Sequence, residues 1–216
     1  MGKIPMTDKR ILWGRATSSN VMKALWALHE LGLPFERIDC GGSFGKTDSP
    51  EYRGMNPTGL VPTLQEDDFT LWESNAIVRY LTRDTPDLFP ADARARANVD
   101  RWMDAQQTTM NRPMAGVFWG LVRTPPEKRD LKTVAAAIEE TAKYWRMAEA
   151  EIEQRGYLGG AAFTIADIPW GVHAHRWFNI DYQGLSRPEM PALRAWYDRL
   201  CKRPAYQKAV MATPIA

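Results

Sequence analysis

Cysteine and histidine are scarce in this chain of 216 residues, with two and three copies respectively. Cys40 and Cys201 lie far apart and form no CxxC pair, so the redox and zinc motifs built on that spacing are absent. His173 and His175 stand two positions apart, which places them on different faces of a helix. With no further ligand nearby we expect no metal site. The sparse, unpaired cysteines are typical of a reduced, cytoplasmic protein.

Long apolar runs are also missing. None approaches the roughly 18–20 residues that span a bilayer, and residues 1–10 are polar and lack the apolar core of a secretory signal. The formal net charge is only +2, and the Lys and Arg residues are scattered. We therefore expect neither a nucleic-acid nor a membrane partner. With 44% hydrophobic and 25% charged residues, the composition is that of a soluble globular protein with a sizeable core.

What is present divides the chain in two. The first part is predicted to have the order β-α-β and then β-β-α, with turns containing Gly, Pro or acidic residues between the elements. Its expected strands are 11–13, 34–39, 63–65 and 69–71, and its expected helices begin at residues 20, 50 and 74. A helical face of Val21, Ala24, Leu25 and Leu28 ends at Gly32. The proline-rich segment 84–92 is the predicted linker.

Beyond the linker the strand signals disappear. The expected helices are 93–119, 127–154, 165–177, 191–201 and 204–212. This order predicts an α/β domain at residues 1–84 followed by an all-α domain at residues 85–216. Thr164-Ile165-Ala166-Asp167 resembles a capping box, and we interpret it as a helix start rather than as a catalytic motif.

The Val61–Pro62 step is the most informative local feature, because it stands at the entry to a strand. Proline has no N–H for a sheet ladder, so it must occupy an edge or a turn, where a cis bond is tolerated. This arrangement leaves the Val61 backbone N–H and C=O available to a ligand. Glu73 and Ser74 follow at the start of a helix. Ser74 can cap that helix, or its hydroxyl can bind a ligand carboxylate while Glu73 pairs with an ammonium group.

Ser18-Ser19-Asn20 precedes another predicted helix. These residue types are good N-caps, and the same geometry can also stabilise an anion, because hydroxyl and amide groups at a helix N-terminus donate hydrogen bonds along the dipole. Such an environment lowers the pKa of a thiol. No GxSxG turn surrounds the serines, so a nucleophilic serine is not indicated.

These motifs, in this order, resemble those of the cytosolic glutathione transferases. Asn56-Pro57-Thr58-Gly59-Leu60-Val61-Pro62 and the Glu73-Ser74 pair resemble the thioredoxin-like domain of that family, while segments 163–168 and 203–206 resemble its helical domain. The serine-type site is similar to those of the phi, theta and zeta classes and of a bacterial subgroup with Thr-Pro-Asn. The resemblance covers nearly the whole chain.

The resemblance implies a homodimeric enzyme with glutathione as co-substrate and no metal. It implies that Val61, with Pro62 in cis, binds the cysteinyl backbone, and that Glu73 and Ser74 bind the γ-glutamyl end. Where phi-like relatives carry a polar residue this chain has Leu60, so Lys46 is the substitute contact for the glycyl carboxylate. Ser18, Ser19 and Asn20 are the candidates for activating the thiol, and the phi-like arrangement favours Ser18.

An electrophilic small molecule in an apolar pocket of the helical domain is the implied second substrate. Soft and aromatic side chains there, such as Trp102, Met114 and Phe118, serve either the core or that pocket. Three alternatives stay open. The thiolate could attack a disulfide or peroxide, the enzyme could be a glutathione-dependent isomerase of the zeta type, or the protein could bind ligands without catalysis.

Overall fold

The computed structural model describes residues 9–215 of the chain. Contacts among them define two compact units. The first runs to Ala91 and also includes Pro204–Thr213, and the second is Asp92–Arg203. The sequence predicts a boundary between residues 84 and 85 and keeps 85–216 together, but by its contacts the segment 204–213 packs with the first unit.

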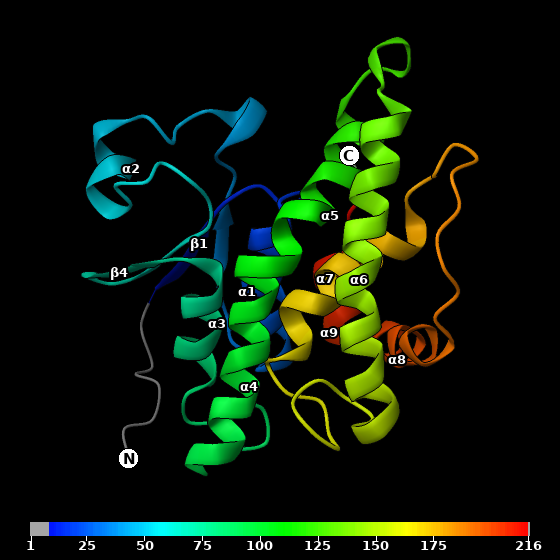
Figure 1. The fold of residues 1–216 in the computed structure, drawn as a ribbon. Helices are drawn as coiled ribbons and strands as arrows, with labels where there is room; N and C mark the ends of the chain where they lie inside the picture. The colour runs from blue at the N-terminus through cyan, green and yellow to red at the C-terminus, as the bar shows by residue number, and fades with distance from the viewer. Residues whose placement is uncertain (1–8, 216) are drawn as a thin grey trace. The chain divides into compact units, whose positions relative to one another are not determined.

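A four-stranded sheet of order β2-β1-β3-β4 forms the base of the first unit. β1 pairs in parallel with β2 and antiparallel with β3, and β3 pairs antiparallel with β4. The predicted β-α-β then β-β-α order is therefore confirmed (Figure 1). The elements are β1 Arg10–Trp13, α1 Ser19–Glu30, β2 Glu36–Ile38, α2 Pro50–Met55, β3 Thr63–Glu66, β4 Phe69–Trp72 and α3 Ser74–Thr82.

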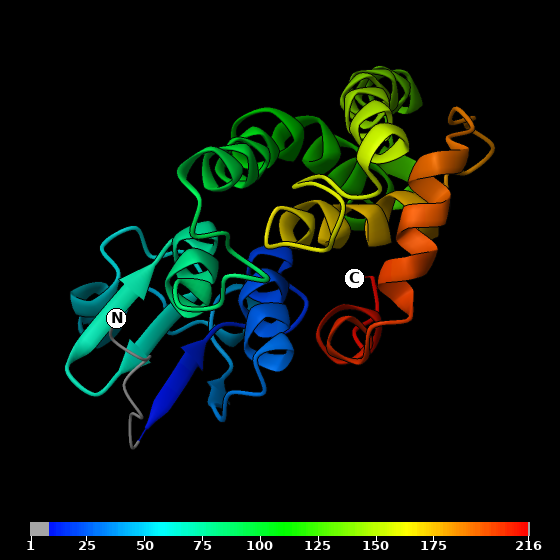
Figure 2. The ribbon, with the colours of Figure 1, turned by 90° about the horizontal axis from the view of Figure 1, so that it is seen from below.

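Helices α1 and α3 lie side by side on one face of this sheet (Figure 2). The predicted apolar face of α1 is buried, and so are the strand residues Leu12 and Leu64. Gly32, with φ of 62°, follows the end of α1, a backbone conformation that glycine adopts without a Cβ penalty.

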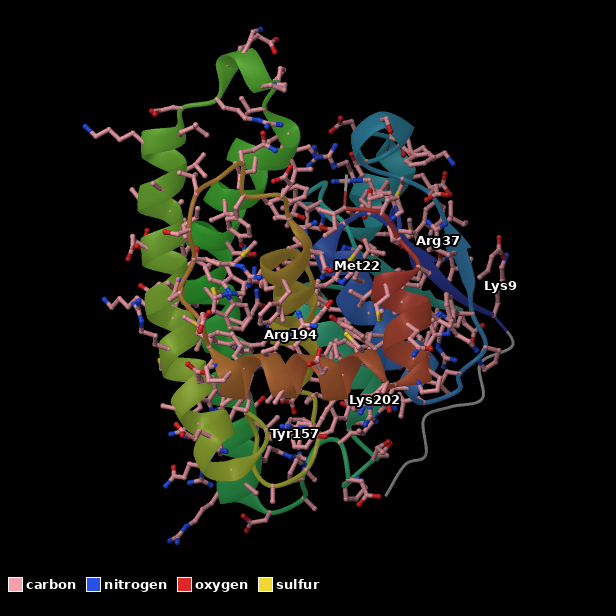
Figure 3. The ribbon with its side chains drawn as sticks, turned by 90° about the vertical axis from the view of Figure 1, so that its right-hand side faces the viewer. Lys9, Met22, Arg37, Tyr157, Arg194 and Lys202 are labelled. Carbon is pink, nitrogen blue, oxygen red and sulfur yellow. The ribbon has the colours of Figure 1, made fainter. Side chains whose placement is uncertain are left out.

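The end of the chain returns to α1. The short helix α9 (Pro204–Tyr206) and the π-helical turn Gln207–Met211 both pack against α1, as Figures 2 and 3 show from two sides. In Figure 3 Met22 is labelled on α1 next to this segment. The rings of Trp26 and Tyr206 have centroids 4.5 Å apart. Residues separated by most of the sequence thus share one core.

The second unit is helical throughout its regular structure. Its α-helices are α4 Ala93–Ala105, α5 Asn111–Phe118, α6 Leu131–Arg155, α7 Asp167–Asn179 and α8 Pro191–Cys201. None of the helices among residues 9–215 combines the length and apolar character needed to cross a membrane.

Three helices of this unit differ from their predicted course, and two of these differences have a local reason. The expected helix 93–119 contains π-helical turns at Gln106–Met110 and Trp119–Arg123; Pro113, in the turn that follows the first, has no N–H for a regular i→i−4 bond. The helix expected from Glu127 begins at Leu131, because the Asp130 carboxylate caps the N–H groups of residues 132 and 133. The helix expected from Ile165 begins at Asp167.

Asp167 is fully enclosed in the second unit. Its carboxylate accepts hydrogen bonds from the N–H of Leu158 at 3.1 Å, the N–H of Thr164 at 2.9 Å and the indole of Trp196 at 2.9 Å. Burial nevertheless raises its pKa to about 6, from an ordinary value of 3.8. These bonds join a loop, a helix start and α8, which supports the structural interpretation of the Thr164–Asp167 motif.

Candidate active site

The loop between β1 and α1 carries Ser18 and lies over the loop that follows β2. The N–H of Gly14 donates to the carbonyl of Ile38 at 2.9 Å, and the N–H of Arg15 donates to the carbonyl of Cys40 at 3.1 Å. Ser18 occupies the N-cap position of α1 with extended backbone angles, yet its hydroxyl makes no capping hydrogen bond. The helix therefore does not use this hydroxyl, and it is available to a ligand.

The start of α1 favours negative charge. Its 12 residues align their peptide dipoles with the positive end at Ser19, and the first turn contains no acidic residue. An anion placed beside Ser18 would face the N–H groups of that turn, which have no acceptor within the helix. Chemically, the site is suited to stabilising a thiolate.

A hydrogen bond joins α1 to α3. The Ser74 hydroxyl, nearly buried in the first turn of α3, donates to the Asn20 side-chain oxygen at 3.3 Å. The structure thus brings together two residues that the sequence had assigned to different subsites, one for thiol activation and one for the γ-glutamyl group.

Glu73 precedes Ser74 with a φ of 70°. A positive φ is uncommon for a residue with a Cβ, and such backbone conformations cluster at functional sites. Glu73 holds the N-cap position of α3, but its side chain makes no capping hydrogen bond and is exposed. Among the residues that the structure describes it also forms no ion pair, so its carboxylate can meet a ligand cation.

The Val61–Pro62 peptide bond is cis, as predicted. Within residues 9–215 the Val61 backbone forms no hydrogen bond. Val61 lies close to the β1–α1 loop: a methyl group added to Gly14 would come within 3.3 Å of the Val61 Cβ, and one added to Gly41 within 3.1 Å of its Cγ1. An unpaired stretch of backbone therefore adjoins the Ser18 loop.

The two residues predicted for the glycyl end differ in position. Leu60 has a side chain that is 68% exposed, and its carbonyl accepts hydrogen bonds from Tyr52 at 2.6 Å and Asn56 at 2.9 Å. Lys46 is exposed, with a φ of 69°, and its ammonium makes no hydrogen bond or ion pair within the described part of the chain. No contact ties Lys46 to the other predicted site residues there.

Arg15 was not identified from the sequence as a site residue, although it lies in the loop that carries Ser18. Methyl groups added to Gly41 and Gly42 would lie 3.0 Å from its Nη1 and 3.2 Å from its Nε, so the guanidinium rests on a backbone that only glycine leaves open. The nearby Asp39 is paired with Arg37, which Figure 3 labels. Arg15 itself has no ion pair among the described residues. In the sequence, only the Gly41-Gly42 pair indicates a backbone against which a side chain can pack closely.

Cys40 adjoins this loop but is not poised to react. It is buried, and this burial raises the pKa of its thiol. As for metals, residues 9–215 contain no cluster of three or more His, Cys, Asp and Glu side chains able to hold an ion. The groups gathered at the candidate site are hydroxyl, amide, guanidinium and carboxylate groups.

Both halves of this chain are similar to families of known proteins. The family described as Glutathione S-transferase, N-terminal domain matches residues 17–84, and Glutathione S-transferase, C-terminal domain matches residues 132–199. Glutathione S-transferase GstB of Escherichia coli K12 is 40% identical over 204 residues, covering 93% of this chain and 97% of its own.

Solved structures agree with these sequence matches. A theta class glutathione S-transferase from Xanthomonas axonopodis pv. citri, crystallised with glutathione bound, is 45% identical. It superposes with a TM-score of 0.91 over 98% of this chain and all of the other. Glutathione transferase F7 from Populus trichocarpa is 25% identical, with a TM-score of 0.85 over 95% of this chain and 99% of its own.

Proposed function

The chain belongs to the glutathione S-transferase family and is a glutathione transferase, and we propose that Ser18, Val61, Glu73 and Ser74 bind glutathione, its co-substrate. One observation carries this assignment: the Ser74–Asn20 hydrogen bond of 3.3 Å places the start of α3 beside the start of α1. Neither helix has an acidic residue in its first turn. The N-terminus of α1 can therefore face the thiolate of glutathione, and that of α3 its glutamyl carboxylate.

The γ-glutamyl end binds at the start of α3. The hydroxyl of Ser74 and the N–H groups of that first turn hold the glutamyl carboxylate, and the Glu73 carboxylate pairs with the α-ammonium. This role is supported by the positive φ of Glu73 and by its lack of any capping bond. A charge-assisted hydrogen bond of this kind contributes roughly 1.5–3 kcal/mol.

The rest of the tripeptide follows the Val61 backbone. Val61 pairs with the cysteinyl unit through its main chain, beside Pro62. At the glycyl end Leu60 offers no polar side chain, so the Lys46 ammonium contacts the carboxylate. This role is supported by the exposure of Lys46 and by the lack of an ion pair to its ammonium within residues 9–215, where the nearby Asp48 pairs with Arg53.

In the reaction, the ionised sulfur is the nucleophile. The Ser18 hydroxyl donates to the thiolate, with Ser19 and Asn20 as neighbouring candidates, and Arg15 adds a positive charge. The thiol proton leaves to solvent. The sulfur lone pair then forms a new S–C bond, and the leaving group departs from that carbon with the bonding electron pair. Stabilising the thiolate raises its population at neutral pH.

The helical residues beyond residue 84 supply the electrophile-binding side chains, and the active protein is a cytoplasmic homodimer. Support for the dimer comes from the family, and sedimentation velocity would test it. An absence of disulfides fits the cytoplasmic assignment, because both cysteines of the chain are free.

A direct test begins with retention on immobilised glutathione, followed by turnover of aryl halides, hydroperoxides and mixed disulfides. The proposal expects retention and activity with at least one class, and weaker retention in Ser74→Ala. Retention without turnover of any class would instead favour a non-catalytic binding protein. Turnover confined to disulfides or peroxides would favour a reductase.

A further inference from the structure

The backbone that precedes Val61 is held by a closed set of buried side chains. The Leu60 carbonyl accepts from the Tyr52 hydroxyl at 2.6 Å and from the Asn56 Nδ2 at 2.9 Å. Both donors also contact the Thr63 hydroxyl, at 2.9 and 3.0 Å. Tyr52 and Asn56 are 1% and 2% exposed, whereas the Leu60 side chain is 68% exposed. Leu60 is therefore fixed through its carbonyl and not by packing.

The Asn56 side-chain amide uses both its donors and both its acceptor positions in hydrogen bonds. Its oxygen accepts from the N–H of Thr58 at 3.1 Å and from the Thr58 hydroxyl at 2.7 Å, while its NH2 group makes the two donations to Leu60 and Thr63. The Thr58 hydroxyl also accepts from the N–H of Leu60 at 3.2 Å. An amide with all four positions engaged has one orientation available to it.

Peptide geometry passes this constraint to the next residue. The Leu60 C=O and the Val61 N–H belong to the same planar peptide group, which is trans, since Val61–Pro62 is the cis bond that the structure records. In a trans peptide the two bonds point in opposite directions. Because the carbonyl is directed at Tyr52 and Asn56, the Val61 N–H is directed away from them and out of their buried network.

We infer that Tyr52 and Asn56 are positioning residues that aim the Val61 N–H at the backbone of bound glutathione. This inference rests on the proposed function, because it assigns a cause to the orientation of its cysteinyl subsite. Neither side chain touches the ligand in this arrangement. Their effect falls on affinity, and the Ser18 hydroxyl and the Arg15 charge set the ionisation of the thiol independently.

Tyr52→Phe tests the inference with the loss of a single oxygen atom. The ring, which packs edge-on against Trp13 with centroids 6.2 Å apart, stays in place. Losing one neutral hydrogen bond to the carbonyl should raise the Kd for glutathione roughly three- to tenfold. The pKa of the bound thiol and kcat at saturating glutathione should stay within about twofold of wild type, because no group at the sulfur changes.

Tyr80→Phe is the matched control. Like the Tyr52 hydroxyl, the Tyr80 hydroxyl makes one hydrogen bond of 2.6 Å within the first unit, but its acceptor is the Glu66 carboxylate. This variant should lose a similar amount of stability in a thermal melt while keeping the wild-type Kd. An unchanged Kd in Tyr52→Phe would overturn the inference. So would an equal rise in Kd in the two variants, because affinity would then follow stability alone.

An amide spectrum of the isotope-labelled chain separates this inference from the proposed function. In the ligand-free protein, Tyr52→Phe should move the Val61 N–H resonance and Tyr80→Phe should leave it in place. Adding glutathione to the wild type should move the same resonance and slow its hydrogen exchange. If the wild type binds no glutathione, the proposed function fails, and the ligand-free comparison still decides whether the network orients Val61. An unmoved resonance in Tyr52→Phe would refute it.

Discussion

The Ser74 hydroxyl donates to the Asn20 side-chain oxygen at 3.3 Å, across the interface between α3 and α1. In the ligand-free protein this bond satisfies a hydroxyl that we assign to the glutamyl carboxylate. Binding therefore exchanges one hydrogen-bond acceptor for a charged one, and it releases the Asn20 oxygen to another donor. The long distance is consistent with a weak bond that a carboxylate can replace.

Ser74→Ala should weaken glutathione binding by about 1.5–3 kcal/mol, because a charge-assisted hydrogen bond is lost. Titration calorimetry measures the change. Cysteinylglycine, which lacks the γ-glutamyl group, should bind both proteins equally. Ser186→Ala, an exposed loop substitution, serves as the control. Equal losses for the two peptides would indicate a general defect in folding.

Ser18→Ala should raise the pKa of the bound thiol by roughly one to two units, since a hydrogen bond to a charged sulfur is worth about 1.5–3 kcal/mol at 1.36 kcal/mol per unit. Affinity at low pH, where the thiol is neutral, should change little. The absorbance of the thiolate at about 240 nm follows the titration of the bound thiol. If Ser19→Ala moves the titration and Ser18→Ala does not, Ser19 is the activating residue.

Arg15→Gln should also raise the pKa of the bound thiol, by about one unit, because a nearby positive charge favours the thiolate. Arg15→Lys should restore part of the shift, since the ammonium keeps the charge but not the planar fork. High salt should weaken the wild-type effect and leave Arg15→Gln unaffected. A thiol pKa that is the same in all three proteins would remove Arg15 from the site.

Glu66→Gln should lower the free energy of unfolding by about 3 kcal/mol, because it leaves the Arg10 charge buried without its partner. Arg10 and Glu66 are both nearly inaccessible, with Nε and Oε1 2.5 Å apart. Urea denaturation measures the loss. Tyr80→Phe, which removes only the bond from Tyr80 to Glu66, should lose about 1 kcal/mol. Comparable losses in both variants would mean that the ion pair contributes nothing beyond a neutral hydrogen bond.

Asp167 should make stability depend on pH. Burial raises its pKa to about 6 in the folded protein, from an ordinary value of 3.8. Between these two pH values the folded state therefore holds a proton that the unfolded state has released. Stability should therefore fall as pH rises through this window, by roughly 3 kcal/mol, and then level off. Asp167→Asn should remove this slope, as urea denaturation between about pH 4 and 7 would reveal. A slope equal to that of wild type would contradict the assignment.

Much of the first unit followed from local signals. The apolar spacing of α1, the turn at Asp67 and Asp68 and the Val61–Pro62 step gave its elements, since each depends on neighbouring residues alone. The helix beginning at Leu131 and the π-helical turn before Pro113 did not. The first depends on which backbone N–H groups the Asp130 carboxylate caps, and the second on how a helix accommodates a proline that has no N–H.

The candidate residues of the site could be named from the sequence, but their connections could not. Motifs identified Ser18, Asn20, Glu73 and Ser74, but the Asn20–Ser74 bond depends on how two helices pack. Arg15 escaped notice because its place is defined by Gly41 and Gly42, which lie far along the sequence and contribute only a missing Cβ. The Leu60 carbonyl network was hidden for a related reason, since its side chains converge on a backbone carbonyl that leaves no trace in the sequence.

The return of residues 204–213 to α1 sets an order of events during synthesis. Tyr206, which packs against Trp26, leaves the ribosome only after the second unit up to Arg203 has been made. Until then the surface of α1 that it covers has no native neighbour there. The unit that begins first is consequently completed last, and a ribosome stalled within the final helices would hold a nascent chain with an uncovered tryptophan, a target for chaperones and proteases.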